Sequence, residues 1–427
     1  MEGFPAPPKP ALPGAALTVP VPLERTIAPT STAEVVETLR GASAARQPVY
    51  PLGGNTSQNF GLPARQPGLG LALTGLSQVI DYPARDMTIT VEAGITLAEL
   101  AQTLAAERQR LPIDVPAPAQ ATLGGVIATN WSGARRYGQG TIRDYVIGIS
   151  AVDGRGRPFK GGGRVVKNVA GYDFCKLLTG SLGTLGVITQ ATLKIRPAAE
   201  RSALVACGVS SFERAEALLA ALVHTRTTPT ALELLAGPAW QSDRSLGPPS
   251  QSDVCRLVVG LEGTDVEVAW MIDALRREWS DAGAEAHVVA ADETQPLWDR
   301  LAEFPADASA PLVIKANVLP AEVAGFVRLV ISLDSQASVQ AHAGNGIVLA
   351  RFADFPAAKV SAQLIGQLQP AAAKAGGNVV VLSSIYQAEL TARAVWGVRR
   401  ASADLMQAVK REFDPQGILN PGRYVVD

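Results

Sequence analysis

The residues of this chain best suited to chemistry are clustered glycines, which lie in loops of its first half. One cluster lies in the stretch 116–145, which contains Gly124, Gly125, Gly133, Gly138 and Gly140. Because glycine has no Cβ, the backbone of such a stretch can approach a flat or highly charged group closely. Thr122 precedes a segment that can open a helix, and we expect the free N–H groups of its first turn to form an anion site.

A second cluster follows a short apolar run. Residues 47–52 are typical of a strand, and this strand is followed directly by Gly53, Gly54, Asn55, Thr56 and Ser57. Two glycines beside amide and hydroxyl side chains can form a nest of backbone N–H groups, for which a diphosphate is a suitable ligand. An ordinary surface turn is the alternative for this segment taken alone.

The common nucleotide motifs are absent from the sequence. No G-x-G-x-x-G joins a strand to a helix, and no G-x-x-x-x-G-K-[ST] occurs. A Rossmann or Walker type of site is therefore not expected. Further glycine loops at 161–163 and 180–186 can either contact a cofactor or serve as tight turns. Several separate glycine loops between strands indicate an α+β domain with a cofactor lying across it.

Size and composition exclude several classes of protein. With 427 residues, the chain suits two or three domains at about 150 residues each. Its 38 basic and 39 acidic residues give a net charge of −1, which argues against nucleic acid or an anionic membrane as the main partner. No long apolar run predicts a membrane span, and the Pro-rich residues 1–24 predict a flexible tail rather than a secretory signal. We expect a cytoplasmic protein, membrane-associated only through partners.

Cysteine and histidine are both scarce. The cysteines, Cys175, Cys207 and Cys255, are far apart, so neither a disulfide framework nor an internal iron–sulfur cluster is expected. Each is expected to be a small buried residue. A metal site needs several converging ligands, and none is expected from the available histidines, which are His224, His287 and His342.

The hydrophobic patterns predict an α+β chain. We expect helices from an N-cap at 30–32 to about Arg40 and over 97–107, and a strand over 143–152 that ends in a hairpin turn at 153–156. In the second half, the segments 312–318, 321–331, 338–342, 347–352, 357–374 and 379–382 follow a β-α-β-β-α-β order. This order is typical of a ferredoxin-like antiparallel sheet with helices on one face. A last helix is expected over about 391–412, followed by a turn-rich tail that packs back on the first domain.

The glycine loops, taken together and in this order, resemble the FAD-binding domain of the vanillyl-alcohol oxidase / p-cresol methylhydroxylase family. The segments VVKNVAGYDFCKLLTGSLGTLGVIT and FDPQGILNPGRY look like those of the FAD-binding subunits of bacterial glycolate oxidases. The resemblance implies a two-part FAD-binding domain over 25–197, a ferredoxin-like cap domain over 198–405, and a C-terminal segment, 406–427, that packs on the FAD-binding domain.

The resemblance also assigns residues to the cofactor. It places the phosphate loop on Gly53, Gly54, Asn55, Thr56 and Ser57. It places the second flavin loop on Pro116, Thr122, Leu123, Gly124, Gly125, Asn130, Gly133, Tyr137, Gly138 and Ile142, and the adenine-side contacts on Gly186, Val187 and Ile188. Some relatives bind flavin covalently through a histidine in these loops. All histidines of this chain lie outside them, so non-covalent FAD is expected.

The function that the resemblance implies is that of an FAD-binding subunit in a glycolate oxidase complex, which oxidises glycolate to glyoxylate. A homologous flavoprotein subunit would carry the full hydroxy-acid site, and an iron–sulfur subunit would accept the electrons. The alternatives are a free-standing FAD-linked 2-hydroxy-acid dehydrogenase of the D-lactate type and a non-catalytic subunit that only holds flavin.

The catalytic residues are less well defined. Catalytic relatives carry H-x-G-D-G-N-x-H, whereas this chain has His342 followed by AGNGIV, without the carboxylate and the second histidine. His342 is a candidate base, and a hydrogen-bonded structural histidine is the alternative. Arg399 and Arg400 could pair with a substrate carboxylate or lie on a solvated helix face. Lys167 is left unassigned, and Trp131 is expected to be part of the core or of a cavity wall.

Overall fold

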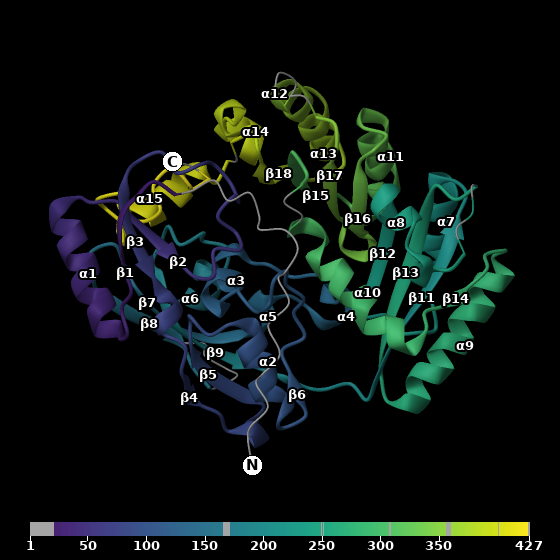
Figure 1. Cartoon of the computed structure of the whole chain (residues 1–427), viewed down its shortest axis with the longest axis horizontal. Helices are drawn as coiled ribbons and strands as arrows, with labels where there is room; N and C mark the ends of the chain where they lie inside the picture. The colour runs from purple at the N-terminus through teal and green to yellow at the C-terminus, as the bar shows by residue number, and fades with distance from the viewer. Residues whose placement is uncertain are drawn as a thin grey trace, which may run out of the picture.

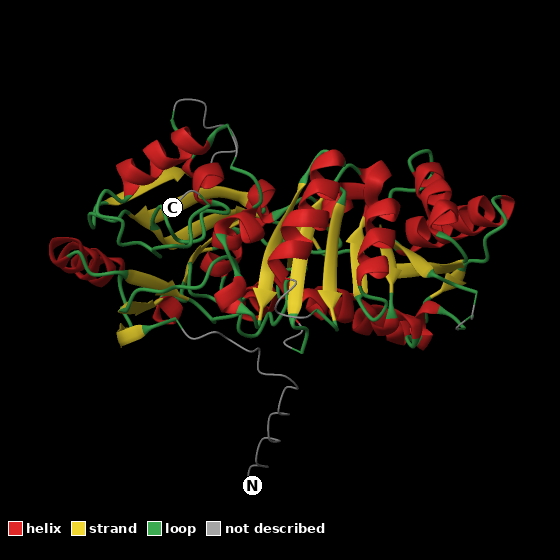
Figure 2. Cartoon of the chain, turned by 90° about the horizontal axis from the view of Figure 1, so that it is seen from above, coloured by secondary structure: helices red, strands yellow, loops and turns green. Residues whose placement is uncertain are grey.

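The computed structural model describes residues 21–164, 171–248, 250, 252–306, 309–355, 360–399 and 401–425. Two α+β lobes lie side by side (Figures 1 and 2). The first lobe contains the described residues up to Pro197 together with the C-terminal segment, and the second contains residues 198–399. Lys167, Arg400 and residues 1–20 of the Pro-rich tail lie outside the described residues.

A small parallel sheet forms one part of the first lobe. Its strands, in spatial order, are β1 (Leu23–Ile27), β3 (Gly68–Ala72) and β2 (Val49–Leu52). Helix α1 (Thr32–Ala45) buries Val35 and Leu39 in one core cluster with this sheet. The side chain of Ser31 caps α1 as expected, and the helix continues beyond the predicted end at Arg40.

An antiparallel sheet forms the other part of the first lobe. Its strands, in spatial order, are β4 (Val79–Asp81), β5 (Thr88–Glu92), β9 (Val187–Lys194), β7 (Val146–Val152) and β8 (Pro158–Gly162). The helices that accompany it are α2 (Leu97–Ala105), α3 (Leu123–Thr129), α4 (Arg136–Gln139), α5 (Ile142–Tyr145) and α6 (Phe174–Leu178). The predicted strand 143–152 was wrong at its start, because the Asp144 carboxylate accepts from the Thr141 amide at 2.8 Å and opens α5.

The described strands of the second lobe include one eight-stranded antiparallel sheet. Their spatial order is β14 (His287–Val288), β11 (Arg201–Val209), β13 (Cys255–Gly263), β12 (Ala231–Ala236), β16 (Ser338–His342), β17 (Ile347–Phe352), β15 (Leu312–Asn317) and β18 (Asn378–Ser384). In chain order they make two β-α-β-β-α-β units, which confirms the ferredoxin-like prediction. The units join where β12 pairs with β16, with Glu233 opposite His342.

The two faces of this sheet are covered differently. The outer face shares one core cluster with residues of several helices, among them α7 (Phe212–Leu222), α9 (Asp265–Asp281), α11 (Val323–Leu333) and α13 (Gln369–Lys374). The inner face turns towards the first lobe and also receives α10 (Ala291–Glu303), through Leu297, Trp298 and Leu301. The prediction of helices on one face omitted α10.

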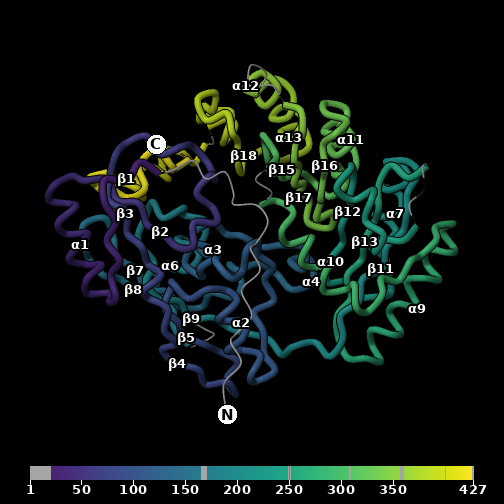
Figure 3. The backbone as a smooth tube through the Cα atoms, in the orientation of Figure 1, coloured from purple at the N-terminus to yellow at the C-terminus, as the bar shows by residue number. Residues whose placement is uncertain are grey.

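The C-terminal segment returns to the first lobe. The single helix predicted over 391–412 was wrong, because α14 (Ala392–Trp396) ends at Gly397 with φ of 82° and α15 (Ala403–Phe413) starts afresh. The tail then runs beside β2, where the Val49 amide donates to Ile418 O at 2.8 Å. Figure 3 shows this yellow segment beside the purple strands of the N-terminal part. No described helix is long and apolar enough to cross a bilayer.

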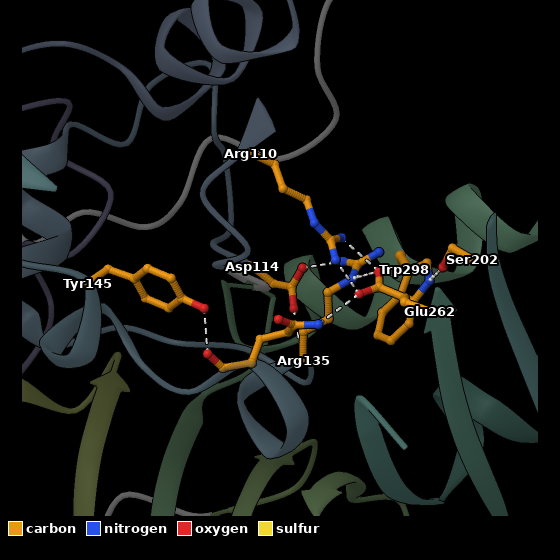
Figure 4. A network of polar contacts seen from close by, with 8 residues as sticks. Arg110, Asp114, Arg135, Tyr145, Ser202, Glu262 and Trp298 are labelled. Carbon is orange, nitrogen blue, oxygen red and sulfur yellow. Dashed lines mark hydrogen bonds and ion pairs between the residues drawn. The ribbon is translucent and has the colours of Figure 1, made fainter. Parts of the chain in front are cut away.

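A buried ionic network joins the lobes (Figure 4). The Arg135 guanidinium contacts Asp114 and donates to Glu262 on β13 at 2.7 Å, and its Cζ lies 3.8 Å from the centre of the Trp298 ring. Arg110 adds two hydrogen bonds to Glu262, at 2.9 and 2.6 Å. Burial alone would raise the pKa of Glu262, but the two arginines hold it below its usual value.

We expect Glu262→Gln to destabilise the protein by about 3 kcal/mol at pH 7, because it leaves Arg110 and part of Arg135 without their counter-charge. Because the pKa of Glu262 is lower in the folded protein than the value of about 4.3 in the unfolded chain, the carboxylate stabilises the fold fully at pH values above that of the unfolded chain. This stabilisation is lost as the pH falls through the pKa of the folded protein. The difference between variant and parent should therefore shrink below about pH 4.

Urea unfolding at pH 7 and at acid pH measures both effects. Glu285→Gln is the matched control, because Glu285 is exposed. Equal stability of the two variants at pH 7 would contradict the role assigned to the network.

Candidate functional site

A pocket of the first lobe is formed by loops from distant parts of the sequence. It is lined by residues 53–57 after β2, by Thr122, Gly124 and Gly125 at the start of α3, and by residues 186–188 at the start of β9. Asn420 and Arg423 of the C-terminal tail complete it. Ser57, Gly124 and Val187 therefore share one pocket, although they are far apart in the sequence.

The loop 53–57 packs tightly against the segment before α3. A Cβ on Gly54 would lie 1.7 Å from Gln120 O, and a Cβ on Gly53 would lie 2.1 Å from Thr122 Oγ1, so only bare backbone fits. Among the described residues, no hydrogen bond is recorded for the amides of residues 55–57. These amides are available to a ligand in the pocket, as a nest requires.

The first turn of α3 does not provide the anion site that the sequence suggested. The Leu123 amide donates to Ile95 O at 2.9 Å, and the Gly124 amide donates to Ala93 O at 2.7 Å. The Gly125 amide faces the Thr122 hydroxyl oxygen at 3.4 Å. The helix itself is confirmed, but the expectation of free N–H groups was wrong, because the 93–95 loop accepts them. Helix α3 contributes Gly124 and Gly125 to the pocket wall, and their lack of side chains permits a ligand to approach the backbone closely.

Polar atoms near the pocket lack partners among the described residues. Arg423 donates to Gln58 O at 2.7 Å and to Phe60 O at 3.2 Å, which places its guanidinium beside the 53–57 loop. Its buried Nε has no described partner, and burial lowers the pKa of Arg423. Since buried polar groups are normally satisfied, this donor fits a polyanionic cofactor. The buried Asn130 Oδ1 is also unpartnered, but it is an acceptor, and Asn130 lines neither this pocket nor the cavity beside it.

Sequence reasoning had not assigned Arg423 to the site. Its signal was the turn-rich ending FDPQGILNPGRY, which carries this arginine into the first lobe. The cue was therefore in the sequence, but the tail's contact with the 53–57 loop is a tertiary feature.

A second cavity adjoins the pocket at the boundary of the lobes. The two share Phe60, Thr129 and residues 54–57. From the first lobe it adds Pro116 and Trp131, and from the second it adds Trp240, Phe304, Arg351 and Leu382. Trp131 is thus a cavity wall residue, as predicted.

The other residues that the resemblance assigned to the second flavin loop do not line the first pocket. Leu123 and Ile142 are fully buried in the core. A Cβ on Gly133 would lie 2.5 Å from the Asp114 Cβ. The Gly138 amide donates to Thr230 O at 3.0 Å, and Tyr137 packs on the second lobe's core. Tyr137 and Gly138 therefore lie at the lobe junction, whereas Leu123, Gly133 and Ile142 pack within the first lobe.

His342 belongs to a buried polar group on the inner face of the large sheet. Its Nδ1 lies 2.8 Å from Glu233 Oε1, and Gln340 donates to Glu233 Oε2 at 2.9 Å. Glu233 was missed by sequence reasoning, although a lone carboxylate in the apolar strand ALELLA was a usable signal. His342 is therefore a hydrogen-bonded histidine held by a carboxylate.

Arg399 lies elsewhere. Its guanidinium donates to Asp404 at 2.7 Å, and both side chains are exposed, at 61% and 89%. Arg399 lines neither cavity, so it is not carried into the proposed site.

The three cysteines are buried, as the sequence predicted. Burial raises the pKa of Cys175 to about 11 and the pKa values of Cys207 and Cys255 to about 12, and all three are buried free thiols. No cluster of His, Cys, Asp or Glu in the described residues could hold a metal ion.

Comparison with known proteins identifies the family of both lobes. Residues 23–162 match the FAD binding domain family, and residues 198–380 and 393–424 match the FAD linked oxidases, C-terminal domain. The glycolate oxidase subunit GlcD of Bacillus subtilis is 25% identical over 93% of this chain and 88% of that protein. GlcE of Escherichia coli, another glycolate oxidase subunit, is 33% identical over 38% of this chain and 46% of that protein.

Two further similarities extend over the length of the chain. A D-lactate dehydrogenase of Archaeoglobus fulgidus is 28% identical over 93% of this chain and 90% of that protein. The solved structure of an alkyldihydroxyacetonephosphate synthase matches with a TM-score of 0.67 and 19% identity, over 93% of this chain and 76% of that one, which speaks for the fold alone. The chain therefore belongs to the FAD-linked oxidases of the p-cresol methylhydroxylase type, and it is an oxidoreductase whose cofactor is FAD.

Proposed function

We propose that this chain is the FAD-binding subunit of a complex that oxidises glycolate to glyoxylate. The observation that carries the proposal is the continuity of the loop-lined pocket with the cavity between the lobes, which gives a dinucleotide and a small substrate adjoining spaces. Two relatives of the chain are named as glycolate oxidase subunits, which supports this choice of substrate and a multi-subunit assembly.

The chain's own residues would hold FAD from several sides. The amides of residues 55–57 and the Arg423 guanidinium would bind the diphosphate, and Gly124 and Gly125 would let the cofactor approach α3. Residues 186–188 would contact the adenine side through their backbone. With its histidines outside these loops, the chain would bind FAD non-covalently. When bound, FAD supplies the hydride acceptor.

The cavity between the lobes would receive the substrate. Trp131, Trp240 and Phe304 give it apolar walls, and Arg300, Glu303 and Arg351 add charged groups. On the same inner face, Glu233 holds His342 through Nδ1 and fixes the orientation of the imidazole, but neither side chain lines the cavity.

Partners complete the proposed reaction. Electrons would pass to an iron–sulfur subunit, and a homologous flavoprotein would carry the full hydroxy-acid motif that the His342 segment lacks. In this assembly the chain would lie in the cytoplasm and meet a membrane only through partners.

A free-standing 2-hydroxy-acid dehydrogenase is the second candidate. The end-to-end similarity to a D-lactate dehydrogenase favours it. The two candidates differ in whether the isolated chain, loaded with FAD, is reduced by D-lactate without any other subunit.

We expect Gly54→Ala to weaken FAD binding at least about tenfold, since overpacking costs 1–3 kcal/mol and each 1.4 kcal/mol is tenfold in affinity. The added methyl would meet Gln120 O and push the 53–57 loop away from α3. Gly325→Ala is the control, because a Cβ there meets nothing within 4 Å. Quenching of FAD fluorescence measures the affinity, and unchanged binding in Gly54→Ala would contradict the placement of the diphosphate.

Purification of the tagged chain from its native cells tests the proposed complex. We expect it to bring down a second flavoprotein and an iron-containing subunit, with glycolate-dependent dye reduction in the pooled complex. Flavin and iron counted per chain give the composition. Recovery of the chain alone as a fully active oxidase would contradict the proposal and favour the free-standing dehydrogenase.

A further inference from the structure

The loop 116–121 of the first lobe lies directly behind the 53–57 loop of the pocket. A Cβ on Gly54 would lie 1.7 Å from Gln120 O, so the two backbones are in contact with no side chain between them. Because such a contact has no space to absorb movement, a displacement of Gln120 must also displace Gly54. The position of the 53–57 loop therefore depends on the conformation of the loop 116–121.

Ala117 holds this loop in a turn through a backbone conformation that residues with a side chain seldom adopt. Its φ is 48°, in the left-handed region, where the Cβ is crowded by a carbonyl oxygen. The Gln120 and Ala121 amides both donate to Ala117 O at 2.8 Å and close the turn. A residue strained in this way persists only where its surroundings hold it.

Contacts from both lobes hold the turn. From the first lobe, the Ala98 amide at the start of α2 donates to Pro118 O at 3.0 Å. From the second lobe, the Glu303 carboxylate accepts from the Ala117 amide at 2.7 Å. This second contact is a charge-assisted hydrogen bond, and it is made to the strained residue itself. The second lobe therefore contributes directly to the conformation of the loop.

The place of Glu303 in its own helix does not account for its charge. Glu303 is the last residue of α10, where the negative end of the helix dipole disfavours a carboxylate. The Ala117 amide is a donor that offsets this effect. Glu303 and Ala117 also line the cavity between the lobes, and this cavity shares residues 54–57 with the pocket. A glutamate at this position is explained by its contact with Ala117 and not by the stability of α10.

We propose that Glu303 is a positioning residue for FAD. By holding Ala117 in its left-handed conformation, it fixes the loop 116–121 and, through Gln120, the 53–57 loop that binds the diphosphate. The inference rests on the placement of the diphosphate under the proposed function. It goes beyond that function because it makes the second lobe part of the cofactor site, whichever 2-hydroxy acid is oxidised.

Titration of the full-length chain, freed of flavin, with FAD tests this role through the quenching of flavin fluorescence. We expect Glu303→Ala to weaken FAD binding about fivefold, the usual net effect of losing one hydrogen bond. Glu303→Gln should stay within about twofold of the parent, because its side-chain carbonyl can still accept from the amide. Glu303 is exposed, so these variants leave no buried charge unpaired. Glu285→Ala removes another exposed glutamate of the second lobe and is the control.

Ala117→Gly separates positioning from a general loss of stability. Glycine adopts a φ near that of Ala117 without the Cβ penalty, so the turn then needs Glu303 less. We expect Ala117→Gly alone to bind FAD as the parent does. In the Ala117→Gly background, Glu303→Ala should weaken binding by less than about twofold. If Glu303 only stabilised α10 or the contact between the lobes, its loss would have the same effect in both backgrounds.

Hydrogen–deuterium exchange of the flavin-free chain observes the turn itself. The amides of Gln120 and Ala121, which donate to Ala117 O, should exchange faster in Glu303→Ala than in the parent. In the double variant with Ala117→Gly, their exchange should return towards the parent rate. Unchanged exchange in Glu303→Ala would contradict the hold of Glu303 on the turn.

Failure of the positioning role and failure of the proposed function give different results. Weaker FAD binding in Gly54→Ala, with unchanged binding in Glu303→Ala, would overturn the role of Glu303 and leave the placement of the diphosphate standing. An equal loss from Glu303→Ala with alanine or glycine at position 117 would also overturn that role. Unchanged binding in both Gly54→Ala and Glu303→Ala would overturn the placement and the role together. Binding that depends on Glu303 through Ala117, in a complex that does not oxidise glycolate, would support the role and overturn the proposed substrate.

Discussion

The close approach of two backbone segments is the constraint on which the site depends. Gly53 and Gly54 lie against the 120–122 segment at distances that leave no space for a Cβ. This contact fixes the loop after β2 relative to α3, and the gap that remains between them is the pocket. The C-terminal tail strengthens the arrangement, because it pairs with Val49 and places Arg423 over the same loop. In a cofactor site of this kind, the position of the backbone determines binding more than the identity of the side chains does.

The second organising feature is the contrast between two adjacent arginines. Arg135 is buried in an ionic network with Asp114 and Glu262, so it holds the lobes together. Arg136 has no recorded ion pair among the described residues, and burial lowers its pKa despite the opposing charges of Asp144 and Glu233.

The sequence was sufficient for the features that are local. Separate glycine loops between strands indicated an α+β domain with a bound cofactor, since turn chemistry depends on neighbouring residues, and their resemblance to a known family implied that the cofactor is FAD. The use of the Leu123 and Gly124 amides by the 93–95 loop was not predictable, because the acceptors come from another segment. The Glu233–His342 pair depends on the register of β12 against β16, which no local pattern reveals. Helix α10 was missed, and it contains Pro296, which usually marks a break.

The central claim is that backbone segments distant in sequence hold one FAD molecule together. Hydrogen–deuterium exchange of the intact protein, with and without saturating FAD, tests it most directly. The account predicts simultaneous protection of amides in residues 53–57, 186–188 and 420–423, with little change on the outer helices α7 and α9. Protection confined to one of these segments, or found only in the second lobe, would contradict it.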